Sequence, residues 1–179
     1  ASAGDYRAVT GPCGFVFPRD HGAHPDFRTE WWYYTGNLGT PSGKRYGFQL
    51  TFFRSQLAEP GSEKTWPKNP SAWRTKDLFL AHSALSDAET KRFYLDERVA
   101  RSGAGLSGVT QDNDATRVFI GNWSAIIESD THRLKAQTRE FAIDLVSKAT
   151  KPLTAHGTEG YSLKGKNPES ASCYYSYTP

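Results

Sequence analysis

A run of four large aromatic residues, 31–34, stands between a carboxylate and a turn-forming glycine in the stretch EWWYYTG. Neighbouring side chains of a β-strand point to opposite faces, so the odd-numbered pair would line one face and the even-numbered pair the other. A sheet with one face in water needs aromatic residues on one side only. This run therefore predicts a strand that is covered on both faces.

Composition favours a β-rich interior. Hydrophobic residues make up only 37% of the 179 residues, yet aromatic residues reach 13%. Such a chain is more typical of β-structure with an aromatic interior or a ligand cavity than of a helical bundle. At this length one core and one domain are expected.

Short alternating segments follow one another along the chain, without a sustained helical period. We predict roughly eight strands, which indicates an antiparallel sandwich or an up-and-down barrel. A further strand is expected at 171–177. The Gly- and Ser-rich stretch 99–108 is expected to be a loop, with a short helical turn as the alternative. The eight predicted strands are 30–38, 44–54, 76–85, 92–97, 117–120, 123–128, 134–137 and 140–147.

Charge and motifs exclude several classes of protein. The 22 basic and 19 acidic residues give a net charge of +3 and are scattered, so we expect no nucleic-acid partner. No apolar run approaches the roughly 18 residues of a membrane span, so no transmembrane segment is expected. The chain has no CxxC, GxSxG, HExxH or nucleotide-loop motif, and we expect no cofactor.

The start of the chain and the cysteines bear on its compartment. The chain begins with Ala-Ser-Ala and contains no Met. Small residues of this kind resemble a signal-peptide cleavage site, so we expect a periplasmic or secreted protein, with association to a membrane surface as a variant of that expectation. Cys13 and Cys173 would form a disulfide if the two ends of the fold meet. Two separate buried thiols are the simpler interpretation, and it is the one we favour.

Chemistry-bearing side chains concentrate directly before the aromatic run. His21 and His24 offer metal ligands, but Gly22 and Pro25 oppose the helical turn that would place both imidazoles on one side. A general acid/base site is a second interpretation, with Glu30 as an acid whose pKa is raised by burial. A third is structural, with a buried Asp–Arg pair and turn-capping histidines that seal the end of the fold. All three remain open, the structural one being favoured for any single residue. The residues concerned are Asp20, His21, His24, Asp26, Arg28 and Glu30.

Two residues outside this block are further candidates. Arg54 ends its predicted strand, and we interpret it as a solvated strand end. Alternatively it meets Glu30 across the hairpin, because residue 30 would lie opposite a residue near 52. His82 shares a strand face with Leu78 and Leu80, where a hydrogen-bonded core histidine is the more usual outcome than a catalyst.

Several segments together resemble a known family. FPRDHGAHPDFRTEWWYYTGNL, YGFQLTFFR and DLFLAHSALSD, with EGYSLKG and ASCYYSYT near the end, are similar to the lipocalin-like carotenoid 1,2-hydratases (hydroxyneurosporene synthases), a family that includes AttH-type proteins. The resemblance covers nearly the whole chain. It implies two lipocalin-like barrels in tandem, of which this chain matches the first.

The resemblance also implies a function. Members hydrate an isolated C=C bond of a long apolar polyene without a redox cofactor, and others are labelled secreted hydrolases. Protonating an alkene needs a general acid in a dry site and leaves a carbocation that aromatic faces stabilise. We therefore expect a hydratase- or hydrolase-like protein for an isoprenoid- or lipid-like molecule. The alternative is a non-catalytic carrier of a hydrophobic ligand.

These inferences define one set of expectations. The fold is an all-β, lipocalin-like antiparallel up-and-down barrel, with a lead-in at 1–29, a barrel at 30–160 and a linker to a second domain at 161–179. The partners are a hydrophobic small molecule and that second lipocalin-like domain. The catalytic candidates are Glu30, His21 and Asp20. The ligand-binding candidates are Trp31, Trp32, Tyr34, Arg54 and His82, and no metal is expected.

Overall fold

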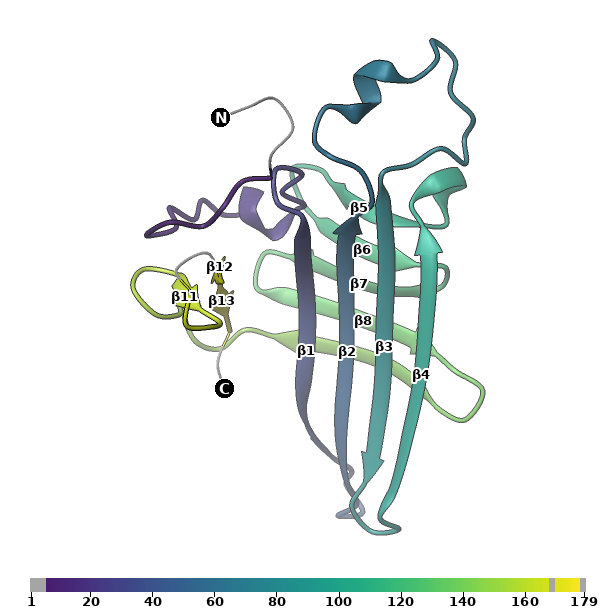
Figure 1. Cartoon of the computed structure of the whole chain (residues 1–179). Helices are drawn as coiled ribbons and strands as arrows, with labels where there is room; N and C mark the ends of the chain where they lie inside the picture. The colour runs from purple at the N-terminus through teal and green to yellow at the C-terminus, as the bar shows by residue number, and fades with distance from the viewer. Residues whose placement is uncertain (1–5, 168–169, 178–179) are drawn as a thin grey trace.

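The computed structural model describes residues 6–167 and 170–177, which are built almost entirely from antiparallel strands (Figure 1). Three short 3-10 turns, at Arg19–His21, Ser62–Thr65 and Gly103–Gly105, are the helical segments of the described residues. The strands are β1 (Thr29–Gly39), β2 (Arg45–Gln56), β3 (Asp77–Asp87), β4 (Arg92–Arg101), β5 (Ser107–Gln111), β6 (Thr116–Ile120), β7 (Trp123–Glu128), β8 (Thr131–Gln137), β9 (Ala142–Lys148), β10 (Thr154–Ala155), β11 (Tyr161–Leu163), β12 (Ala171–Cys173) and β13 (Tyr175–Ser176).

The strands form two main sheets in up-and-down order. One sheet has the order β1-β2-β3-β4 and the other β5-β6-β7-β8-β9. Figure 1 shows the strands of the second sheet running behind and across those of the first. The all-β antiparallel prediction is confirmed, and the pairing of the described strands gives two sheets rather than one continuous closed barrel.

The core lies between the two sheets, because each strand alternates between an inward and an outward face. Leu50 and Phe52 of β2 are fully buried, as are Trp123 of β7 and Leu134 of β8. The indole Nε1–H of Trp123 donates to the carbonyl of Gln137 over 2.8 Å, so this large side chain is buried without an unpaired donor. The predicted alternation of the second strand is confirmed.

The structure differs from the sequence prediction where the chain passes from the first sheet to the second, and also at 171–177, where the one expected strand is two short strands, β12 and β13. The stretch 99–108, expected to be a loop, contains the end of β4 and the start of β5, and the alternative of a short helical turn is confirmed at Gly103–Gly105. β5 begins Ser-Gly, which has a low intrinsic preference for strands. Its strand conformation comes from pairing with β6, in which Val109 lies opposite Val118.

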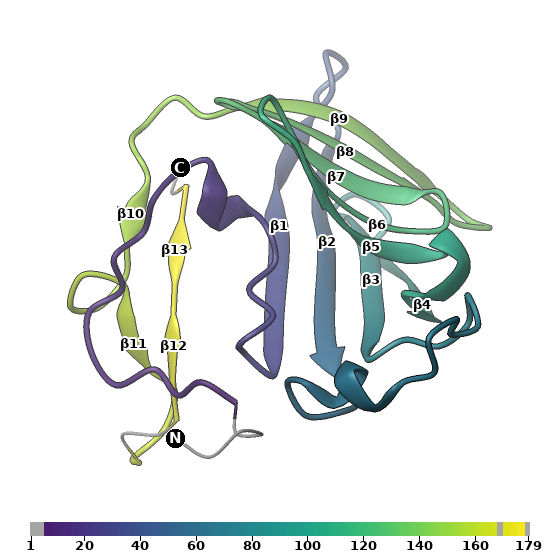
Figure 2. The same ribbon diagram turned by 90° about the horizontal axis from the view of Figure 1, so that it is seen from above.

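The open side of the fold lies between β1 and β9. Each is an edge strand, and no pairing joins them in the described part of the chain. We call this open side between β1 and β9 the seam. Figure 2 shows the lead-in segment and the short pairs β10-β13 and β11-β12 beside β1 there. The described residues include no helix with the length and apolar character of a membrane span.

Candidate functional site

Arg54 is hydrogen-bonded to carboxylates of the first sheet and to carbonyls of the lead-in. It lies opposite Glu30 in the β1–β2 register, and its Nε donates to Glu30 Oε2 over 2.7 Å. It also donates to Asp77 Oδ1 over 3.0 Å. Its remaining nitrogen donates to the carbonyls of His24 and Phe27, both over 2.8 Å. The side chain is only 2% exposed, so the interpretation as a solvated strand end is wrong and the pairing with Glu30 is confirmed.

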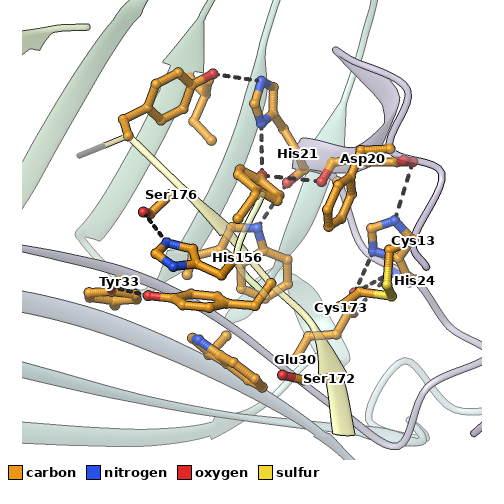
Figure 3. Close-up of a pocket in the computed structure, with 18 of the residues that line it drawn as sticks. Cys13, Asp20, His21, His24, Glu30, Tyr33, His156, Ser172, Cys173 and Ser176 are labelled. Carbon is orange, nitrogen blue, oxygen red and sulfur yellow. Dashed lines mark hydrogen bonds and ion pairs between the residues drawn. A yellow bond between two sulfur atoms is a disulfide. The ribbon is translucent and has the colours of Figure 1, made fainter. Parts of the chain in front are cut away.

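His24 and Asp20 continue this arrangement into the lead-in. The His24 backbone N–H donates to both Glu30 carboxylate oxygens over 2.8 and 2.9 Å, and its Nδ1 lies 2.6 Å from Oε1. The hydrogen bond to Glu30 raises the pKa of His24, since it favours the protonated ring. His24 Nε2 lies 3.4 Å from Asp20 Oδ1 (Figure 3).

The Asp20 carboxylate is buried, and both of its oxygens accept hydrogen bonds. Arg19 Nε lies 2.5 Å from Oδ1, and the Val16 N–H donates to Oδ2 over 2.7 Å. Burial raises the pKa of Asp20, but the hydrogen bonds from Arg19, Val16 and His24 outweigh it and hold the pKa at about 2. Basic and acidic side chains thus alternate along this series of contacts, which comprises Arg19, Asp20, His24, Glu30, Arg54 and Asp77.

His21 belongs to a different, largely uncharged group. It is buried, its carbonyl accepts the Trp32 indole N–H over 2.8 Å, and its Nδ1 lies 2.9 Å from Tyr175 Oη. Burial lowers the pKa of His21 to about 4, with a further lowering by His132 and an opposing effect of Asp20. The ring is therefore neutral near pH 7.

His132 faces His21 from the second sheet. It is 5% exposed, and its Nδ1 lies 3.1 Å from Tyr34 Oη. The Tyr177 ring packs edge-on against His132 with centroids 5.1 Å apart, and Tyr177 Oη lies 3.5 Å from His21 Nε2. Burial lowers the pKa of His132 and raises the pKa of each of the three tyrosines of the group. We call His21, Tyr34, His132, Tyr175 and Tyr177 the histidine–tyrosine cluster.

The outer face of β1 carries a second aromatic group. Tyr174 packs against Trp31 and Tyr33 with ring centroids 6.3 Å apart in both pairs, and its hydroxyl is hydrogen-bonded to that of Tyr33. The His156 ring stacks on Tyr174 at 4.4 Å, and its Nε2 lies 2.6 Å from Ser176 Oγ (Figure 3). Both faces of the aromatic run therefore have packing partners, as the sequence predicted, although Tyr33 remains 40% exposed.

A disulfide fixes the last strands to the lead-in. Cys13 and Cys173 are bonded across a sequence separation of 160 residues, so the favoured interpretation as separate thiols is wrong (Figure 3). The Cys13 N–H also donates to the carbonyl of Glu159 over 3.0 Å. The bond closes the fold at the seam.

The seam encloses a large, partly open cavity of about 1420 Å³. The histidine–tyrosine cluster and the outer aromatic group both line it, together with Phe48 of β2 and Ser147 of β9. Ligand pockets for small molecules are typically about 300–1000 Å³, so the space suffices for a lipid-sized ligand. The aromatic lining residues are Phe15, Phe27, Trp31, Trp32, Tyr33, Tyr34, Phe48, Tyr174, Tyr175 and Tyr177.

The predicted site residues fall into three places. Six of them line the cavity, namely Asp20, His21, Glu30, Trp31, Trp32 and Tyr34. Arg54 is not among the lining residues and supports Glu30 instead. His82 lies on the outer face of the first sheet, where its Nε2 is 2.9 Å from Glu97 Oε1, and does not line the cavity. The described residues contain no group of three or more side chains able to hold a metal ion.

Sequence reasoning missed His132, His156 and the partners from the last strand. Of these residues, His132 could have been identified from the sequence, because it alternates with Leu134 and Ala136 and shares the inward face of β8 with them. A histidine that alternates with apolar core positions is a buried-site candidate. The other residues join the site only through contacts distant in sequence.

The comparisons with known proteins agree with this architecture. A family model described as AttH-like matches residues 8–179. The chain belongs to the AttH-like family. A crystal structure of a candidate AttH from Nitrosomonas europaea is 36% identical to this chain, with a TM-score of 0.78. No curated protein matches the chain.

The AttH-like chain spans about half of that relative. The match covers 96% of this chain and 49% of the Nitrosomonas europaea chain. The resemblance that the sequence motifs indicated is therefore confirmed at the level of the AttH-type family.

Proposed function

We propose that this AttH-like chain binds a hydrophobic small molecule in the cavity beside β1. The observation that carries the proposal is the cavity itself, of about 1420 Å³, with its aromatic lining at the seam between two edge strands. Aromatic faces supply large apolar contact areas, and a few polar groups among them fix the orientation of a ligand. This is the carrier alternative of the two functions expected from the sequence.

The geometry supports binding better than hydration or hydrolysis by the predicted residues. Glu30 accepts hydrogen bonds from Arg54 and His24, contacts that suit a carboxylate acceptor rather than an acid poised to protonate an alkene. Asp20, with a pKa of about 2, holds no proton near pH 7. His21 is neutral there, because its pKa is about 4. None of the three is a strong proton donor in this arrangement.

A matched pair of variants tests the proposal. Ser147→Trp places an indole at the cavity wall, whereas Val146→Trp places the same ring on the opposite face of β9, where Val146 is 63% exposed. The uncharged fluorophore N-phenyl-1-naphthylamine should bind the native chain saturably with one site. Ser147→Trp should weaken this binding at least about ten-fold, and Val146→Trp should leave it unchanged. Absence of saturable binding to the native chain, or equal effects of both variants, would overturn the proposal.

The resemblance implies two further features, which we propose with it. One is a second lipocalin-like domain, which would correspond to the part of the Nitrosomonas europaea chain that this chain does not match. Export to the periplasm or outside the cell is supported by the disulfide, because such bonds persist in oxidising compartments. Cell fractionation with a thiol-blocking label tests the second point: a cytoplasmic protein with free Cys13 and Cys173 would contradict it.

A further inference from the structure

His132 carries a polar atom without a partner. The side chain is 5% exposed, and its Nε2 is buried and hydrogen-bonded to no atom of the described residues. Leaving a buried polar atom unpaired costs free energy, so native structures rarely do so without a reason. The His132 ring lines the cavity, but Nε2 itself has almost no accessible surface. A ligand that supplies the missing partner must therefore displace a side chain packed on the ring, such as Tyr177.

The surroundings of this atom are uncharged. Tyr34 contacts the other ring nitrogen, Tyr177 packs against the ring, and His21 lies beyond Tyr177. Burial lowers the pKa of both imidazoles and raises the pKa of both tyrosines. All four groups are therefore neutral near pH 7, and each can act as a hydrogen-bond donor or acceptor.

The nearest charges are already used. Asp130, which acts on His132, lies 3.3 Å from Lys148 and accepts the Thr131 hydroxyl over 3.1 Å. Asp20, which acts on His21, is held by Arg19. A ligand carboxylate or ammonium buried in the cluster would lose its hydration. Lys148, which also lines the cavity, is already paired with Asp130.

We propose that the histidine–tyrosine cluster receives the polar end of the cavity's ligand at His132 Nε2, and that this end is a neutral oxygen group, an alcohol or a ketone. The inference rests on the proposed binding function and names its ligand class. A hydroxyl pairs with either tautomer of His132, because it both donates and accepts, whereas a carbonyl needs the Nε2–H form. The long apolar part of the ligand would lie along the aromatic lining.

Competition among three probes of equal chain length tests the ligand class. Decan-1-ol, decanoate and decylamine are titrated at pH 7 against N-phenyl-1-naphthylamine bound to the native chain. The alcohol should displace the fluorophore at a concentration at least about ten-fold below that of the two charged probes. A ten-fold difference corresponds to about 1.4 kcal/mol, the size of one hydrogen bond. Equal displacement by the three probes would overturn the inference and leave the binding function standing.

Variants then assign the contact to His132. His132→Phe should retain the fluorophore but bind decan-1-ol about ten-fold more weakly, and His132→Gln, which keeps an amide donor and acceptor, should recover part of the loss. His82→Phe is the control, because His82 lies outside the cavity. If His132→Phe fails to fold, the imidazole ¹⁵N shifts of the native protein decide, since decan-1-ol should move the Nε2 resonance. An unmoved resonance, or full alcohol affinity in the variants, would contradict the assignment, and a native chain that binds no fluorophore would overturn the proposed function with it.

Discussion

Glu30→Gln separates a structural carboxylate from a catalytic one. The Glu30 side chain is 12% exposed and that of Arg54 is 2% exposed, so the pair is effectively out of water. Glutamine keeps one acceptor oxygen but turns an NH₂ group toward donors from Arg54 or His24. Removing one partner of a buried ion pair typically costs about 3–5 kcal/mol, because the other charge stays buried. We expect a loss of stability in that range.

Urea unfolding of matched variants measures this loss. Glu128→Gln is the control, because its pair with Arg133 is about half exposed on both sides, at 43% and 49%. Exposed pairs contribute about 0.2–1 kcal/mol, so the control should be nearly neutral. The double variant Glu30→Gln with Arg54→Met removes both charges and should cost less than the sum of the two single variants.

The size of the stability loss distinguishes a structural from a catalytic role of Glu30. A residue kept for chemistry is often held at a cost to stability, so its neutral substitution leaves stability unchanged or improves it. A loss from Glu30→Gln below about 1 kcal/mol, matching Glu128→Gln, would refute the structural role that we assign to Glu30. The acid/base interpretation of the lead-in would then regain its support.

Three further predictions follow from the same contacts. The double variant Cys13→Ser with Cys173→Ser should unfold at lower urea, since closing a 160-residue separation contributes about 5 kcal/mol in the chain-entropy model. Asp20→Asn should make the free energy of unfolding, followed by circular dichroism, depend less on pH in the acid range. The low folded pKa of Asp20 stabilises the native chain above about pH 4, and this contribution is lost as the pH falls toward about 2. His24→Gln should have the opposite pH profile. Because the folded pKa of His24 is raised, its protonated ring stabilises fully below about pH 6.5, and the gap between native and variant should close as the pH rises above the folded value.

Local pattern was sufficient for most of the first sheet. The predicted hairpin placed residue 30 opposite a residue near 52, and the structure pairs it with Arg54. A shift of two residues leaves each side chain on its predicted face, because the side-chain period of a strand is two. The facing of the β2 side chains was therefore predicted correctly, and the approximate register was sufficient to indicate the Glu30–Arg54 pair. Strand existence and facing are local properties, and alternation reports both.

The environment of a strand end is not local. Arg54 closes an apolar run and looks solvated in the sequence, but the lead-in folds over it and supplies the carbonyls of His24 and Phe27. The disulfide and the approach of His21 to His132 likewise join segments more than 100 residues apart. No period or motif encodes such contacts, since they depend on how the two sheets and the end segments pack.

The aromatic run shows how one local pattern acquires two roles. Its odd-numbered pair packs on Tyr174, while Trp32 reaches His21 and Tyr34 reaches His132. The last segment is extended as well: Tyr174, between β12 and β13, packs on the outer face of β1, and Tyr175 of β13 contacts His21 on the inner side. The period of two in both segments thus wraps β1 from both sides, which protects an exposed edge strand. It also gives the cavity its aromatic lining, so a substitution in this run should change stability and ligand affinity together.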